Sequence, residues 1–277
     1  MSLIVIEAGK TERGYWTDLW RYRELFFFLS WRDILVRYKQ TVIGVLWAVI
    51  RPILTMIALT FVFGKLAGVH SDGLPFAVMV LAGTLPWQFF ASSMTEASNS
   101  LITNANMLSK IYFPRLIIPA SSVIVSFMDF LVSLAIMAVL MAWYRVLPGW
   151  QLLTLPLFTL LGLFASVGIS LWLAALNVKY RDFRYVLPFV VQFGVFFTPV
   201  GFPSEVVRQK YGETASHLFS LNPMVGVING FRWAIGGRVG VPMDWSSVLI
   251  SVLVVAVITV SGLRYFRATE ETFADII

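Results

Sequence analysis

Five long apolar stretches decide what this chain can fold into. They are Val42 to Gly64, Leu74 to Ser93, Ile117 to Tyr144, Leu152 to Leu176 and Trp245 to Phe266. A helix that crosses about 30 Å of hydrocarbon needs about 20 mostly apolar residues, so each stretch is long enough to span a membrane. With 58% hydrophobic and 13% charged residues, a soluble domain would lack the polar surface to cover itself. The sequence predicts an all-α integral membrane protein.

A sixth apolar region is shorter and broken. Val186 to Phe202 contains Pro188, Gly194 and Pro199, and Met224 to Ile235 follows after a polar interval. Irregular backbone at membrane depth is tolerated only where protein shields it or where it faces water. We therefore expect six spans in one domain, with short re-entrant gate helices on the external side between spans five and six. The candidate gate residues are Pro199, Phe202, Pro223, Phe231 and Arg232.

The gate helix after the fifth span carries local start and stop signals. Asn222 and Pro223 are typical of a helix start, and Gly236 and Gly237 of its end. The roughly 13 residues between them cover about 20 Å, which is too short for a crossing.

Positive charge is distributed unevenly between the two sides of the membrane. Fourteen Lys and Arg residues fall on the side of the two termini and six on the other. The positive-inside rule therefore places both termini in the cytoplasm, with residues 1–41 forming a tail and interface helix, 42–266 the bundle and 267–277 a second tail. The same bias explains the net charge of +6 without nucleic-acid binding. The first 18 residues show no removable signal peptide.

The segment before the first span predicts an amphipathic helix that lies in the membrane interface. At 100° per residue, one strip is aromatic and apolar, and the residues roughly opposite are charged. The strip contains Trp20, Phe27, Trp31, Ile34 and Tyr38. Leu25, Leu29 and Val36 fall on the charged side, so the helix either anchors the chain or also docks a cytosolic subunit.

The connection between spans two and three, "NANMLSKIYFPRLIIP", has the length and the Asn start of a short helix that ends at Pro114. Its apolar and basic side chains suggest a knob for a groove in another protein. Resting on lipid headgroups is the alternative. The candidate contact residues are Asn104, Met107, Leu108, Lys110, Ile111, Tyr112, Phe113, Pro114 and Arg115.

A permanent cation and a helix breaker interrupt the first span. Nine residues from Val42 place Arg51 about 13 Å into the membrane, and Pro52 follows it, which predicts a kink. A charge at this depth usually faces a bundle interior, a partner or a wet cavity. Arg51 either pairs with Glu96 or Asp129 or lines a path for an anionic or hydroxylated substrate.

Three aromatic residues, Trp87, Phe89 and Phe90, lie inside the second span, where an interfacial belt has no use for them. Flat apolar rings suit sugars, so these residues and Asp129 join Arg51 as candidate channel lining. Cysteine is absent and only two histidines occur, which argues against a metal site. The "GKT" at residues 9–11 lacks the earlier glycine of a phosphate-binding loop, and no catalytic arrangement is recognisable.

Four segments together resemble the permease subunit of type 2 ABC exporters in the bacterial O-antigen and teichoic acid group. They are "WRDILVRYKQTVIGVLWAVIRPIL", "NANMLSKIYFPRLIIP", "LNVKYRDFRYVLPFVVQFGVFFTPVGFP" and "LNPMVGVINGFRWAIGG". The resemblance implies a homodimer in the bacterial inner membrane that binds two copies of a cytosolic ABC ATPase. It implies export of an undecaprenyl-pyrophosphate-linked glycan, with ATP and Mg bound by the partner and no cofactor on this chain.

The same resemblance implies roles for particular segments. Residues 104–115 become the ATPase-coupling helix, residues 20–38 the interface helix, and residues 199–202 and 223–235 the external gate. An ABC exporter of a drug or small lipid is the main alternative. A secondary transporter would need matching broken helices in two halves, and a membrane enzyme would need clustered carboxylates or histidines, neither of which the sequence offers.

Overall fold

The computed structural model describes residues 15–39, 44–71, 73–108, 110–180, 182–239, 241–270 and 272–273, and within these ranges the regular structure is helical. The "GKT" at residues 9–11, Val42 and the last four residues lie outside the described part. The helices are α1 (Tyr15–Arg21), α2 (Arg23–Lys39), α3 (Gly44–Leu59), α4 (Phe76–Thr103), α5 (Ala105–Leu108), α6 (Ile117–Trp143), α7 (Leu155–Lys179), α8 (Phe183–Gly194), α9 (Glu205–Phe219), α10 (Pro223–Ile235) and α11 (Trp245–Glu270). A π-helix, Thr60–Leu66, continues α3, and a 3₁₀-helix, Trp150–Thr154, precedes α7.

Five of these helical segments are long and apolar enough to cross a membrane. They are Leu46–Leu66, Phe76–Thr103, Ile117–Trp143, Trp150–Lys179 and Trp245–Glu270. Each coincides with one of the five predicted stretches, although α4 continues past Ser93 to Thr103. Helix α8 has 12 residues and covers only about 18 Å, so it is too short to cross alone.

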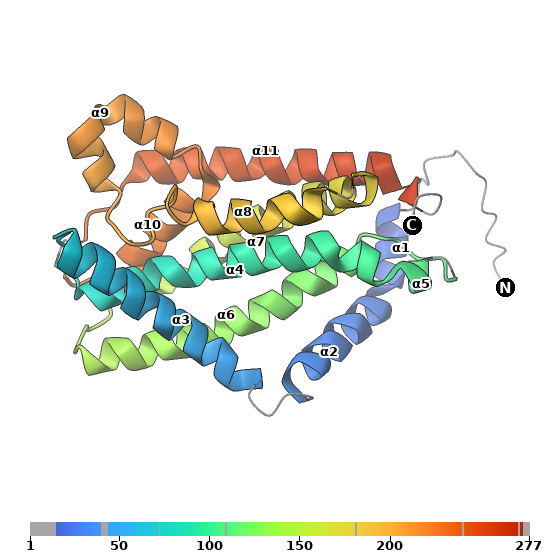
Figure 1. Cartoon of the computed structure of the whole chain (residues 1–277), viewed down its shortest axis with the longest axis horizontal. Coiled ribbons are helices and arrows are strands. Elements are labelled where there is room, and N and C mark those ends of the chain that lie inside the picture. Colours follow the sequence, from blue (N-terminus) through green and yellow to red (C-terminus); the bar gives the residue numbers. More distant parts are fainter. Residues whose placement is uncertain are drawn as a thin grey trace.

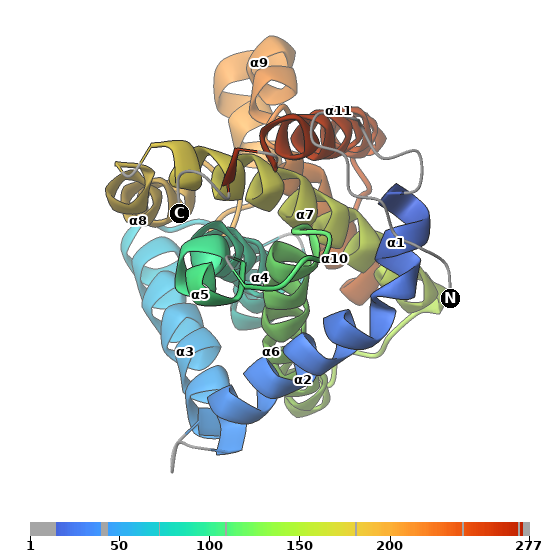
Figure 2. The same ribbon diagram turned by 90° about the vertical axis from the view of Figure 1, so that its right-hand side faces the viewer.

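The long helices run side by side, with α1, α2, α5 and the last turn of α11 at one end, which we call the α5 end (Figure 1). The opposite end, the α9 end, holds α9 and α10. Viewed from the α5 end, α4 lies in the centre of the bundle (Figure 2). In the most apolar stretch of α4, 18 residues long, 83% of the residues are buried. In the corresponding stretch of the span that begins in α3, the share is 6%. Helices α3, α6, α7 and α10 pack on α4, whereas α11 packs on α7 and α10, and α2 packs on α6.

Small residues let α7 and α11 approach closely. A Cβ atom on Gly168 would lie 2.8 Å from the backbone of Thr259, and one on Gly262 would lie 2.3 Å from the carbonyl oxygen of Gly168. Lipid offers no hydrophobic drive for two helices to associate, so such close van der Waals contact supplies much of the attraction. Nearby, Trp172 stacks on Tyr265 with ring centroids 4.2 Å apart.

A second apolar core closes the α5 end. It joins side chains from α2, α4, α7 and α11 to the connection before α6, and its buried members include Leu29, Leu101, Leu108, Phe113, Ile117, Leu171, Phe266 and Phe273. The α5 end is therefore packed, and the short elements there are parts of the fold.

The predicted interface helix, residues 20–38, is in fact two helices that meet at Tyr22. No proline or glycine marks this break. Figure 2 shows α1 and α2 following different directions around the α5 end, so the turn lets both helices follow the outside of the bundle.

Candidate functional site

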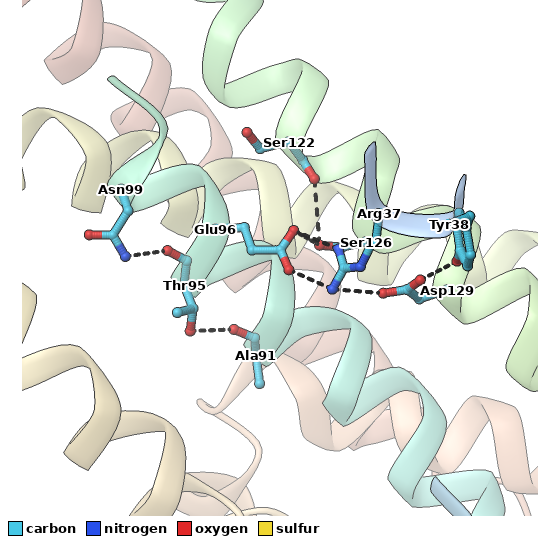
Figure 3. Close-up of polar contacts among 9 residues, drawn as sticks. All are labelled: Arg37, Tyr38, Ala91, Thr95, Glu96, Asn99, Ser122, Ser126 and Asp129. Carbon is cyan, nitrogen blue, oxygen red and sulfur yellow. Dashed lines mark hydrogen bonds and ion pairs between the residues drawn. The ribbon is translucent and has the colours of Figure 1, made fainter. Parts of the chain in front are cut away.

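A cluster of charged side chains joins α2 to the interior of the bundle (Figure 3). Arg37 Nη1 donates to Glu96 Oε2 at 3.0 Å, and Arg37 Nη2 lies 2.8 Å from Glu96 Oε1 and 3.1 Å from Asp129 Oδ2. Tyr38 donates its hydroxyl to Asp129 Oδ1, and Ser126 Oγ donates to Glu96 Oε2 at 3.3 Å. All four carboxylate oxygens of Glu96 and Asp129 thus accept hydrogen bonds or ion pairs.

The electrostatics of the cluster keep Arg37 charged. Burial of its guanidinium disfavours the charge, but the hydrogen bond and charge of Glu96, with the charge of Asp129, outweigh burial and raise the pKa of Arg37. Burial and the hydrogen bond to Asp129 raise the pKa of the Tyr38 hydroxyl. One cation of α2 therefore holds an acid of α4 and an acid of α6.

A cavity of about 110 Å³ lies beside this cluster, between α3, α4 and α6. Its walls combine charged, hydroxyl, amide and aromatic side chains, namely Arg37, Trp47, Ala48, Arg51, Pro52, Leu85, Gln88, Phe89, Ser92, Ser126, Asp129, Phe130 and Ser133. The cavity brings together three of the predicted channel residues from three different helices, namely Arg51, Phe89 and Asp129.

Of the two alternatives for Arg51, the structure does not show the pairing with Glu96 or Asp129. Arg37, which sequence reasoning did not single out, holds both Glu96 and Asp129. Within the described ranges, the guanidinium of Arg51 has no ion pair and no hydrogen bond, and the side chain is exposed. Helix α3 continues through Pro52, and its departure from regular α-helix comes later, at Thr60.

All three predicted channel aromatics, including Phe89 at 4% exposure, belong to the core of this chain. Trp87 and Phe90 are each 8% exposed, and their rings pack together with centroids 5.8 Å apart. Phe89 begins a run of ring contacts that continues through Phe130 to Phe231, with centroids 5.3 and 5.9 Å apart. These rings fill the space between helices of one chain.

The predicted coupling helix is much shorter than expected. Asn104 ends α4 rather than starting a 12-residue helix, and α5 holds only four residues. Leu108 and Phe113 are buried in the second core, so they are not part of an exposed knob. Ile111 and Tyr112 are the exposed apolar residues, at 59% and 50%. Pro114 disfavours helical backbone at the preceding Phe113, whose ring is buried in the second core.

The exit from this segment is tied to the end of α11. The backbone N–H of Arg115 donates to Glu270 Oε1 at 2.9 Å, and the Arg115 guanidinium donates to the carbonyl oxygen of Glu270. Arg267 lies over the ring of Tyr15, 4.3 Å from its centroid, which adds α1 to the same assembly. Met107 is half-buried, Lys110 is exposed, and Pro114 is buried between them and α6.

The predicted aromatic strip divides between two surroundings. Trp20, Phe27 and Trp31 point outward, and the rings of Phe27 and Trp31 stack with centroids 6.4 Å apart. Ile34 is half-buried, and Tyr38 binds Asp129. Leu29, which the helical plot placed on the charged side, is 2% exposed and faces the second core.

At the α9 end, a buried arginine holds irregular backbone. Arg232 is 4% exposed and donates from Nη1 to the carbonyl oxygen of Phe202 and from Nη2 to that of Val200, both at 2.9 Å. A Cβ on Gly83 of α4 would lie 3.0 Å from the same Val200 oxygen, so only a glycine lets this backbone pack so closely. The turns after α8 are thus fixed to α10 and α4.

Helix α10 begins and ends where its local signals predict, at Pro223 and Ile235. Asn222 caps it by accepting from the N–H of Met224 at 3.0 Å, and its side-chain amide donates to Phe197 and Thr198. Pro199 is buried beside this cap, and Phe202 is half-buried between Phe63 and Phe219. Phe231 is 1% exposed and belongs to the main core.

Within the described ranges, no three acidic or histidine side chains gather in a way that could hold a metal ion. The arrangement is that of a multi-pass helical membrane protein with a charged cavity. The family model described as "ABC-2 type transporter" matches residues 24–235. The chain therefore belongs to the ABC-2 type transporter family.

Curated relatives agree with this family. The chain is 28% identical to the O-antigen export system permease protein RfbA of Myxococcus xanthus, over 94% of this chain and 98% of that protein. It is 27% identical to the protein of the same name from Klebsiella pneumoniae, over 92% and 95%. It is 24% identical to the polysialic acid transport protein KpsM of Escherichia coli, over 87% and 91%.

Proposed function

We propose that this chain is the membrane permease of an ATP-driven exporter that moves a lipid-linked polysaccharide, an O-antigen or a similar glycan, across the bacterial inner membrane. The observation that carries this proposal is the similarity to O-antigen export permeases over nearly the full length of both chains. A chain that shared only a membrane scaffold with them would not be expected to match from end to end.

In this proposal the permease itself does not hydrolyse ATP. ATP and Mg are bound by two copies of a separate ATPase subunit, which dock at the α5 end. Ile111 and Tyr112 are exposed there, and the buried neighbours Leu108 and Phe113 connect them to the second core. Closure of the ATPase subunits pushes on this surface and on α1 and α2.

The transmembrane arrangement that fits this function has six spans, with both termini in the cytoplasm. Helix α8 and the turns after it form the fifth, broken span, and α10 forms an external gate with Pro199 and Phe202. The bias of positive charge towards the α5 end supports this orientation. The contacts of Arg232 with Val200 and Phe202 suit a gate whose closed form must be held in place.

Two copies of the chain enclose the export path in this proposal. Helices α3 and α8 lie on the same side of the bundle (Figures 1 and 2). Both present exposed apolar side chains, including Trp47, Leu54, Phe61, Phe189 and Phe193. An exposed apolar surface next to a charged cavity fits an interface between two copies better than contact with lipid alone. Arg51, Phe89 and Asp129 then lie beside the path.

The test is complementation of a strain that lacks this gene. The intact chain, expressed with its ATPase partner, should restore surface glycan, measured by gel analysis and glycan-specific labelling. Loss of a drug or small lipid from the cell, with no change in glycan, would overturn the cargo assignment. The purified chain should not hydrolyse ATP, and robust turnover by the chain alone would overturn the division of labour.

A further inference from the structure

In the cavity between α3, α4 and α6, one guanidinium lies near acidic side chains that already bind other residues. Arg51 lines it together with Gln88 and Asp129. Asp129 accepts from Arg37 and Tyr38, and Glu96 behind it accepts from Arg37 and Ser126. The positive charge of Arg51 is therefore left for a group that enters the cavity from outside the described residues.

The depth of Arg51 restricts which anions can reach it. Arg51 lies five residues after Leu46, where the apolar span begins, and so about 8 Å along the helix from that point. A charged side chain at such a depth costs several kcal/mol unless it meets a partner or water. An anion with a hydrocarbon anchor can approach from within the membrane, whereas a free polar anion must first leave water.

The size and walls of the cavity agree with an anionic head group. A cavity of about 150 Å³ can hold a benzene ring, so a volume of about 110 Å³ suits a small head group such as a phosphate. Trp47, Leu85 and Phe89 supply apolar walls for the first carbons of an anchor. Gln88 and Ser92 supply polar groups beside them.

We propose that this cavity binds the phosphate head of a lipid-anchored ligand, with Arg51 contacting the phosphate oxygens. The planar guanidinium offers paired N–H donors that match two oxygens of a phosphate group, which an ammonium cannot reproduce. Arg37 does not take this role, because its fork is committed to Glu96 and Asp129. The inference rests on the proposed export function for its biological sense, since the cargo lipid would be such a ligand.

The test measures binding of geranylgeranyl diphosphate to the purified full-length chain by calorimetry. We expect the Arg51→Leu variant to bind the probe roughly tenfold or more weakly, because a hydrogen-bonded charge pair is lost. The affinity of the Arg51→Lys variant should lie between those of the intact chain and Arg51→Leu, since lysine keeps the charge but lacks the paired N–H donors. Geranylgeraniol, which lacks the phosphates, should bind equally weakly to all three proteins.

Arg208→Leu is the matched control. Arg208 lies at the α9 end on an exposed helix and pairs with Glu205, so its loss should leave the affinity for the probe unchanged. Equal affinity of the intact chain and the Arg51→Leu variant would overturn the proposal. So would inorganic diphosphate binding as tightly as the prenyl probe, because the anchor would then contribute nothing.

Phosphatidylglycerol distinguishes the two sources of a lipid phosphate. Displacement of the probe at a similar concentration would identify membrane phospholipid as the ligand, and failure to displace it would identify a carrier diphosphate. Light scattering measures self-association of the same variants. If Arg51→Leu changes self-association but not probe binding, Arg51 contacts a partner copy and the proposal is overturned. An intact chain that restores glycan export but does not bind the probe overturns this site alone, whereas binding without export overturns the proposed function alone.

Discussion

At the scale of single residues, two arginines bind different kinds of oxygen acceptor inside the bundle. Arg37 satisfies carboxylates near the α5 end, and Arg232 satisfies backbone carbonyls at the α9 end. Both have their charge surrounded by oxygen atoms, which is how a cation is accommodated inside a membrane protein.

Replacing Arg37 by Leu should destabilise the chain through the acids it leaves behind. Breaking a buried pair costs more than breaking an exposed one, and these side chains are about one-third exposed, so we expect a loss of about 1 to 2 kcal/mol. Thermal unfolding in detergent measures it. The triple variant Arg37→Leu, Glu96→Gln, Asp129→Asn should recover much of the loss, because no unpaired charge remains. A triple variant as unstable as the single one would contradict this account.

Replacing Arg232 by Met should loosen the turns after α8. The carbonyl oxygens of Val200 and Phe202 lose their donors, and that of Met79 loses a longer hydrogen bond, at a cost of about 2 to 4 kcal/mol. Because the chain has no cysteine, Val200→Cys provides a single reporter at a position that is fully buried. A membrane-impermeant maleimide should label it only when Arg232 is also replaced. Equal labelling with and without Arg232 would show that other contacts hold these turns.

At the scale of elements, the segment from α5 to α6 combines a packed base with an exposed tip. Phe113 and Leu108 face the second core, whereas Ile111 and Tyr112 face outward. Glu270 fixes the exit of the segment at Arg115. A force applied at the tip is therefore passed to α11 and α1 as well as to α4 and α6.

Tyr112→Asp should abolish export while leaving the chain folded, because the side chain at this position is 50% exposed and a new carboxylate there stays hydrated until a partner docks. Phe113→Asp should lower stability by several kcal/mol, since the charge would be buried. Glycan export and thermal unfolding separate the two effects. Tyr211→Asp, at an exposed position of α9, is the control and should leave both unchanged. Normal export by the Tyr112 variant would remove this surface from the docking site.

Local signals in the sequence placed some elements well and others poorly. The ends of α10 were predictable because Asn222, Pro223 and Gly236 act through the backbone within a few residues. The short α5 was not, because it depends on where Phe113 finds space in a core built from distant helices. The break at Tyr22 carries no proline or glycine, so only tertiary packing reveals it.

The candidate site shows the same division. The depth of Arg51, Glu96 and Asp129 could be estimated from helix length alone. Which cation meets which acid could not, because Arg37 lies 59 residues from Glu96 in the sequence and reaches it only when α2 packs against the bundle. The charge of Arg37 and its place near the end of the amphipathic segment were the available signal.

At the scale of the whole molecule, exposed apolar residues lie on several outer helices. Helix α4 is enclosed, whereas α3, α8 and α11 all carry exposed apolar residues. The side with α3 and α8 differs from the α11 side because α3 borders the charged cavity, and this position is the basis for the proposed pairing of two chains. It also places the cavity near the surface where a second copy would sit.

Single cysteines should report this pairing in native membranes. Val190→Cys on α8 should form a disulfide-linked dimer on mild oxidation, whereas Val257→Cys on the outer face of α11 should remain monomeric. Both valines are exposed in the single chain, so accessibility alone does not separate them. Non-reducing gel electrophoresis gives the answer. Cross-linking through Val257 but not Val190 would place the interface on the other side of the bundle.

The enclosure of α4 has a consequence for variation among proteins of this shape. A helix that is surrounded by other helices has no exposed face where substitutions are tolerated. A substitution at almost any of its positions must therefore be accommodated by a neighbouring helix. Helix α3, with little of its surface covered, can change along its outer side without such compensation. A saturation library should therefore show depletion spread along the whole length of α4, and on α3 a periodic pattern of depletion every three to four residues.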